Sequence, residues 1–131
     1  MWSRAISFER GHLTIDGLSA RDLAAEFATP TFFIDEEHFR DRARAWAKSL
    51  SLHFGESAGE VYYAAKAFIC TDVARWIKEE GIGIDVCTGG ELAVALAGGI
   101  DPKKIEVHGN NKSVAEIERA VQEGVKTIVL D

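Results

Sequence analysis

From residue 60 onward, short apolar runs alternate with longer segments of helical periodicity. The runs occupy residues 61–65, 82–86, 105–109 and 127–131, and their starts lie about 22 residues apart. Each run is apolar at consecutive positions rather than at alternate ones, which is typical of strands covered on both faces. Regular alternation of strand and helix predicts βαβ units and a parallel sheet. Residues 60–131 are therefore interpreted as about four consecutive βα units of an α/β fold.

The helical segments between the runs carry start and stop signals. The first helix is predicted to begin near Thr71. Its buried face is expected to consist of Val73, Ala74 and Ile77. Gly81 and Gly124 follow helices at positions where a left-handed residue commonly ends a helix, and glycine adopts that conformation without strain.

The second and third helices both open with a sequence that predicts a capping box. In this motif a hydroxyl and a carboxylate three residues later each accept a hydrogen bond from the other residue's backbone N–H. Thr88 and Glu91 form one such pair in TGGE. Ser113 and Glu116 form the other in SVAE.

Residues 1–59 have a less regular pattern. A short strand is predicted first, followed by a helix that begins near Ser19 and a second strand at 31–35. Residues 36–52 predict an amphipathic helix. Its first turn is acidic and its later residues are basic, an order that suits the helix dipole.

The last apolar run reaches Asp131, the final residue, with no helix behind it. An uncovered apolar sheet edge is an aggregation hazard. We therefore expect the chain to be the N-terminal piece of a longer protein. An open, flavodoxin-like sheet built from the same units is the second alternative.

Composition narrows the classes of function. The 131 residues suffice for one modest domain, and a net charge of −6 argues against non-specific nucleic-acid binding. No apolar run approaches the roughly 20 residues that span a bilayer, and no signal peptide is visible, so no membrane partner is expected. Cys70 and Cys87 lack the spacing of a metal site. They are interpreted as two buried thiols in a reducing cytoplasm.

Polar residues stand where the apolar runs end. Lys66, Asp85, His108 and Asp131 follow one another at roughly one βα period. Chemistry in parallel α/β folds gathers at the carboxyl ends of the strands. These four side chains are therefore expected to ring one edge of the sheet.

Lys66 is the least expected of them, because VYYAAKAF is otherwise apolar. Burial of an unpaired charge is costly. The stem of Lys66 can carry its amine to water from the strand end. Alternatively, the lysine is retained for chemistry, since desolvation favours the neutral, nucleophilic form of an amine.

The other candidates also have two interpretations. Asp85 can cap a helix, or it can pair with an amine or a cationic cofactor ring one strand from Lys66. His108 can be a hydrogen-bonded core histidine or part of a binding loop. TGGE opens a helix and is glycine-rich, so it is a weak candidate for phosphate binding.

Three motifs, in this order and spacing, resemble one known family. VYYAAKAF, GIDVCTGGEL and KKIEVHGNNKS resemble the diaminopimelate decarboxylases, pyridoxal-phosphate enzymes of fold type III. ATPTFFID resembles that family's entry segment. The resemblance implies the N-terminal part of an alanine racemase-like (β/α)8 TIM barrel, preceded by a short segment that joins a β-domain. The implied domains are 1–35 for that segment and 36–131 for the first half of the barrel.

The resemblance also implies site residues. Lys66 matches the lysine that holds pyridoxal phosphate covalently, and Asp85 matches the acidic residue beside that link. His108 is assigned to cofactor binding with HGNNKS, a family loop at the rim of the site. No metal is implied.

The implied reaction converts meso-2,6-diaminopimelate to L-lysine and carbon dioxide, the last step of lysine biosynthesis. In the family, the phosphate-binding loop, the substrate-selecting residues and a cysteine from the partner subunit come from later parts of the chain. A homodimer is therefore expected for the full-length protein, and the present piece is expected to be inactive alone. The expected location is the cytoplasm.

Two other interpretations stay open. One is another decarboxylase of this class, acting on ornithine, arginine or carboxynorspermidine. The other is a non-catalytic half-barrel, because half a barrel leaves two open edges and lacks most of the site. An alanine racemase is disfavoured, since AFICTDV lacks the glycine- and histidine-containing stretch that follows the lysine in racemases.

Overall fold

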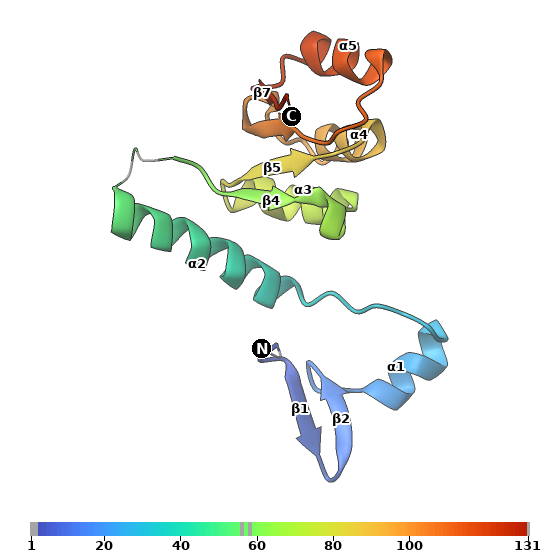
Figure 1. Cartoon of the computed structure of the whole chain (residues 1–131). Coiled ribbons are helices and arrows are strands. Elements are labelled where there is room, and N and C mark those ends of the chain that lie inside the picture. The colour runs from blue at the N-terminus through green and yellow to red at the C-terminus, as the bar shows by residue number, and fades with distance from the viewer. Residues whose placement is uncertain (1–2, 56, 58, 131) are drawn as a thin grey trace. The chain divides into compact units, whose positions relative to one another are not determined.

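The structure, a computed structural model, describes residues 3–55, 57 and 59–130. The chain forms two compact units, Met1–Arg42 and Ala43–Asp131 (Figure 1). The boundary between them falls within helix α2 (Glu36–Phe54). This helix begins where the sequence predicts it, and Asp35 Oδ1 accepts a hydrogen bond from the backbone N–H of His38 at 3.0 Å in the first turn.

The first unit contains an antiparallel sheet and a short helix. The strands β1 (Ile6–Glu9), β2 (His12–Ile15) and β3 (Leu18–Ser19) pair in that order. Helix α1 (Ala20–Phe27) begins after Ser19, as predicted, and the Ser19 hydroxyl accepts a hydrogen bond from the backbone N–H of Asp22.

The predicted strand at 31–35 is wrong. Residues 31–35 pair with no strand among the described residues, and a strand needs a partner to satisfy its backbone groups. The Thr31 hydroxyl instead donates to the carbonyls of Phe27 and Ala28 at the end of α1. The segment therefore connects α1 to α2 as irregular chain.

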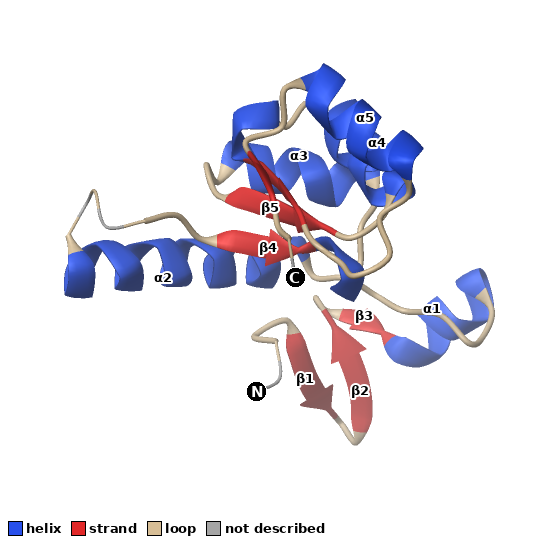
Figure 2. Ribbon diagram, turned by 45° about the horizontal axis from the view of Figure 1, so that its top comes forward, coloured by secondary structure: helices blue, strands red, loops and turns tan. Residues whose placement is uncertain are grey.

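The second unit is built around a parallel sheet. Its strands are β4 (Tyr62–Ala64), β5 (Gly83–Val86), β6 (Ile105–Val107) and β7 (Thr127–Ile128). The helices that connect them are α3 (Thr71–Glu79), α4 (Gly89–Ala97) and α5 (Val114–Glu123). These three helices lie on one side of the strands (Figure 2).

The strand order decides between the two predicted folds. Each strand pairs with the next one along the chain, in the order β4-β5-β6-β7. A flavodoxin-like sheet would place the first strand between the second and the third. The order therefore excludes the flavodoxin-like sheet and agrees with the predicted segment of a (β/α)8 barrel, with three complete βα units and the strand of a fourth in the described residues.

The core lies between this sheet and its helices. Val73, Ala74 and Ile77 of α3 are at most 1% exposed, which confirms the predicted buried face. Ile84 and Ile105, on neighbouring strands, are fully buried. The core is therefore made by the short apolar runs and the helices after them.

The helix ends confirm some predictions and correct one. Ser113 and Glu116 form the predicted capping box at α5. At α4, Thr88 Oγ1 accepts from the Glu91 N–H, but Glu91 Oε2 accepts from the N–H of Cys87 at 2.6 Å instead of Thr88. The predicted box at α4 is therefore half formed, because Glu91 reaches back to the end of β5.

Gly81 and Gly124 adopt the predicted left-handed conformation, with φ of 72° and 74°. Cys70 and Cys87 are free, as expected, but both are half-buried rather than buried. Among the described residues, no helix has the length and apolar composition needed to cross a membrane.

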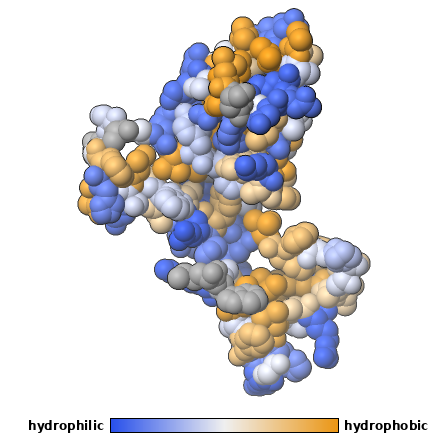
Figure 3. Space-filling view, in the orientation of Figure 1, coloured by the Kyte–Doolittle hydropathy of each residue, from blue (hydrophilic) through white to orange (hydrophobic). Residues whose placement is uncertain are grey.

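Helix α5 presents apolar side chains to solvent. Val114, Ile117 and Val121 lie on its outer surface, and Val114 is 72% exposed. Figure 3 shows apolar atoms gathered over this helix. The surface differs from that of α3, whose apolar positions are buried.

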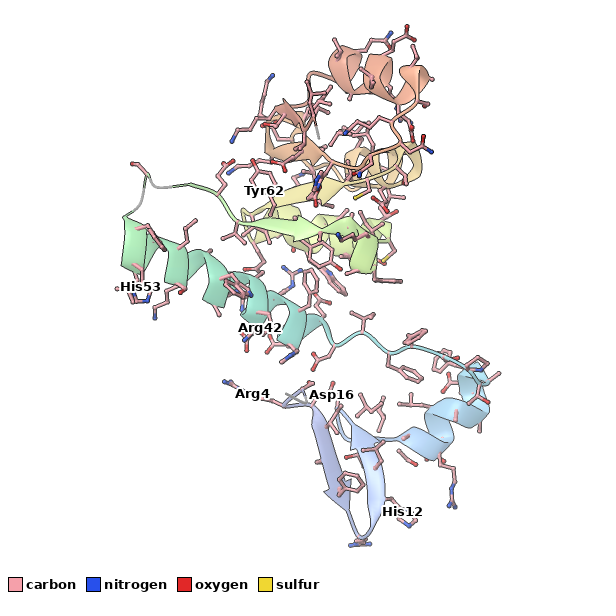
Figure 4. The ribbon with its side chains drawn as sticks, viewed as in Figure 1. Arg4, His12, Asp16, Arg42, His53 and Tyr62 are labelled. Atoms are coloured by element: carbon pink, nitrogen blue, oxygen red, sulfur yellow. The ribbon has the colours of Figure 1, made fainter. Side chains whose placement is uncertain are left out.

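Charged residues join three strands at the edge of the sheet where the strands begin. Glu60, just before β4, accepts hydrogen bonds from Lys104 (2.6 Å), just before β6, and from Lys126, just before β7. The Tyr62 hydroxyl also donates to Glu60 at 2.8 Å. Tyr62 is labelled in Figure 4. Gly83 makes room for this arrangement, because an added Cβ there would lie 2.6 Å from the Tyr62 ring.

We expect Glu60→Gln to lower stability in a pH-dependent way. Hydrogen bonds from Lys104, Lys126 and Tyr62 lower the pKa of Glu60 to about 2. The stabilisation is therefore complete above the ordinary glutamate pKa, and it disappears as pH falls from about 4.5 towards 2. Because the cluster is partly exposed, the loss at neutral pH is about 1 kcal/mol.

Urea unfolding at several pH values measures this effect. The difference between wild type and Glu60→Gln should be constant above pH 5 and vanish near pH 2. Glu118→Gln, at an exposed position on α5, is the control and should change little. A difference that did not depend on pH would contradict the role of the Glu60 charge.

Candidate functional site

Three of the four predicted site residues lie at the edge of the sheet where the strands end. Lys66 is in a single 3₁₀ turn, Ala65–Ala67, directly after β4. Asp85 is in β5, paired with Ala64 of β4. His108 directly follows β6, and its backbone N–H donates to the carbonyl of Val86 at 2.8 Å. The fourth, Asp131, lies outside the described residues.

Lys66 is exposed, whereas the preceding Ala65 is 2% exposed. Of the two interpretations of Lys66, the structure agrees with a stem that carries the amine to water and does not agree with a desolvated amine. The reason is that β4 ends at Ala64, and the 3₁₀ turn carries the lysine past the buried part of the sheet. The amine is accessible to a ligand at this edge.

The two carboxylate oxygens of Asp85 have different surroundings. Oδ2 lies 3.8 Å from His108 Nδ1, a distance that allows an ion pair when the imidazole is protonated. Oδ1 is buried and accepts no hydrogen bond from the described residues. Buried polar atoms nearly always have a hydrogen-bond partner, so this oxygen calls for a donor from a ligand or water.

His108 is not a core histidine, since its side chain is 42% exposed. It belongs to the loop between β6 and α5, in which the Lys112 amine donates to the Gly109 carbonyl. Asp85, by contrast, has a side chain that is 17% exposed. The pair therefore has a half-buried acid and a histidine whose side chain is more open to solvent.

Cys87 lies within the same group of charges. Burial raises the pKa of the Cys87 thiol, the negative charges of Asp85 and Glu91 raise it further, and the positive charges of Lys66 and Lys112 lower it. Three consecutive strands, β4, β5 and β6, and the segments after them thus bring four charged side chains near Cys87.

Sequence reasoning did not predict that Cys87 lies near the site, and it placed Lys112 there only as part of the HGNNKS loop, with no role of its own. A signal for Cys87 was present, because side chains two residues apart in a strand share a face, and Cys87 follows Asp85 by two. Lys112 gives no such signal, since a loop has no fixed period. No group of three metal-binding side chains occurs in the part of the chain that the structure describes.

The start of α4 is already occupied by carboxylates of the chain itself. The N–H of Gly89 donates to Glu116 Oε1 at 2.7 Å, and the N–H of Cys87 donates to Glu91 Oε2. A phosphate would compete with both carboxylates and be repelled by their charges. The structure therefore argues against phosphate binding by TGGE.

Comparison with known proteins gives a consistent result. Residues 36–131 match the family model described as "Pyridoxal-dependent decarboxylase, pyridoxal binding domain". The matched segment contains all of the second unit and each of the residues gathered around Asp85.

Several similar proteins carry the same activity in their names. A diaminopimelate decarboxylase of Mycobacterium leprae is 54% identical over 133 aligned residues, which cover 100% of this chain and 27% of that protein. A crystal structure of diaminopimelate decarboxylase from M. jannaschii has a TM-score of 0.81 and 29% identity, covering 97% of this chain and 30% of that one. A second structure, in co-complex with L-lysine, has a TM-score of 0.80 and 28% identity, with coverages of 98% and 30%. The chain thus spans less than a third of the length of these proteins.

Proposed function

The chain belongs to the pyridoxal-dependent decarboxylases, and we propose that it is the pyridoxal-binding part of a diaminopimelate decarboxylase. The reaction takes meso-2,6-diaminopimelate and a proton to L-lysine and carbon dioxide. The observation that carries the proposal is the exposed Lys66 beside Asp85, whose buried Oδ1 has no partner among the described residues. The 54% identity to a relative of that name supports the choice of substrate.

Pyridoxal phosphate fits the residues at this edge of the sheet. It carries an aldehyde, with which a primary amine such as that of Lys66 can react. It also offers a hydrogen-bond donor in its protonated ring nitrogen or at its link to a lysine, and Asp85 Oδ1 needs a donor. His108 borders the same space with an exposed ring.

When bound, pyridoxal phosphate supplies the electron sink that lets the α-carboxylate leave as carbon dioxide. Lys66 holds the cofactor and, once released by the amine of the substrate, can carry a proton at Nζ. Asp85 provides negative charge that favours a protonated nitrogen nearby. The Asp85–His108 contact orients that carboxylate.

We extend the proposal to the whole protein. Residues 1–35 would join a β-domain, and residues 36–131 would form the first half of the barrel. The protein would be a homodimer in which a cysteine of the partner subunit completes the site. Its location would be the cytoplasm, where Cys70 and Cys87 stay reduced.

The test is a substrate comparison with the full-length protein and added pyridoxal phosphate. Carbon dioxide and lysine are measured with meso-diaminopimelate, ornithine, arginine and carboxynorspermidine as substrates. We expect turnover of meso-diaminopimelate and little or none of the others. Preference for another amino acid would overturn the substrate assignment, and absence of turnover with all four would favour a non-catalytic protein.

A further inference from the structure

Glu116 connects two loops of the site. It lies in the first turn of α5, where its Oε2 accepts hydrogen bonds from the backbone N–H and the hydroxyl of Ser113, at 2.9 and 2.8 Å. Its other oxygen, Oε1, accepts a hydrogen bond from the N–H of Gly89, at the start of α4. One carboxylate therefore bridges two consecutive βα loops.

The second bond goes beyond the helix cap. A capping box uses the carboxylate to accept from its own N-cap residue, and Oε2 fulfils that role. The bond of 2.7 Å from Gly89 to Oε1 spans 27 residues of sequence. It depends on close approach, because a Cβ added at Gly89 would lie 3.1 Å from Glu116 Cγ.

Each of the two bridged segments follows a strand that leads to a residue of the proposed cofactor site. Asp85 is in β5, and Gly89 is the first residue of α4, directly after the short loop that follows β5. Ser113 ends the loop that begins with His108 after β6. Asp85 Oδ2 and His108 Nδ1 are 3.8 Å apart across these two strands. Asp85 is held in the sheet by its pairing with both neighbouring strands, so a movement of the loop that begins with His108 would change that separation.

We propose that Glu116 is a positioning residue for the cofactor site, which holds the loops after β5 and β6 together and so keeps Asp85 and His108 in place. This inference rests on the proposed function. The carboxylate of Glu116 accepts its hydrogen bonds from Ser113 and Gly89, so it acts on the site through the bridge to Gly89.

The test uses the full-length protein with Glu116→Gln. A glutamine has a single accepting oxygen, so it can keep either the capping box or the bridge to Gly89 but not both. The matched control is Asp101→Ala. Asp101 also accepts a backbone hydrogen bond, from Lys103 at 2.9 Å, but at the opposite end of β6. The readouts are the Kd of pyridoxal phosphate, the visible circular dichroism of the bound cofactor and the Tm.

We expect Glu116→Gln to raise the Kd of pyridoxal phosphate about tenfold and to weaken the cofactor dichroism. Asp101→Ala should lower the Tm and leave both cofactor readouts unchanged. The inference is overturned if Glu116→Gln changes the Tm alone, or if Asp101→Ala weakens the cofactor equally. If the wild-type protein binds no pyridoxal phosphate, the proposed function fails and the inference fails with it.

Discussion

Replacement of Lys66 by alanine is expected to abolish covalent attachment of pyridoxal phosphate. The exposed amine of Lys66 stands after β4, beside the carboxylate of Asp85 on the neighbouring strand. Without it, the edge of the sheet keeps its acid and its histidine but loses the nucleophile. Because Lys66 is exposed in a short turn, the substitution should leave the fold intact.

Borohydride reduction followed by peptide mass mapping measures this attachment. In the full-length wild-type protein the label should lie on the peptide that contains Lys66, and in Lys66→Ala it should fall to background. Lys78→Ala, at an exposed position on α3, is the control and should keep the label on Lys66. A label elsewhere in the wild type, or a label that persists in Lys66→Ala, would refute the assignment.

Gly98→Ala is expected to destabilise the protein by about 3 kcal/mol, through overpacking between α3 and α4. A Cβ at Gly98 would lie 2.4 Å from the Cβ of Ala74 and 3.2 Å from the carbonyl oxygen of Thr71. Ala74 is fully buried, and its own Cβ has no room to withdraw. The two helices would therefore have to separate, and the core between them would loosen.

Gly90→Ala is the matched control for this substitution. Gly90 lies in the first turn of the same helix, and the nearest atom to an added Cβ is Thr88 Oγ1 at 3.8 Å. Since alanine favours a helix by up to about 1 kcal/mol over glycine, this variant should be neutral or more stable. Urea unfolding followed by circular dichroism compares the two. Equal stability of both variants would show that the α3–α4 contact is not tight.

Much of the second unit could be predicted from its sequence. Consecutive apolar residues and a regular period predict its strands, and the capping pair Ser113 and Glu116 predicts the start of α5. Parallel strands end at one edge, so Lys66, Asp85 and His108 could be placed together before their contacts were known.

The rest depends on contacts that a local pattern does not contain. Residues 31–35 have the composition of a strand, but strand formation requires a partner. The exposure of Lys66 follows from the turn that ends β4 after three residues. Glu91 and Glu116 both match a capping motif, yet their bonds to Cys87 and Gly89 depend on how the loops fold back.

The cluster around Glu60 and the proposed cofactor site lie at opposite ends of the sheet. It connects β4, β6 and β7 where these strands begin, whereas Lys66, Asp85 and His108 stand where strands end. Substitutions where the strands begin can therefore change the thermal stability of the fold. Substitutions where the strands end can change the chemistry of the proposed site. An engineer, or natural selection in a warmer habitat, could strengthen the contacts of Lys104 and Lys126 without altering the residues of the proposed cofactor site.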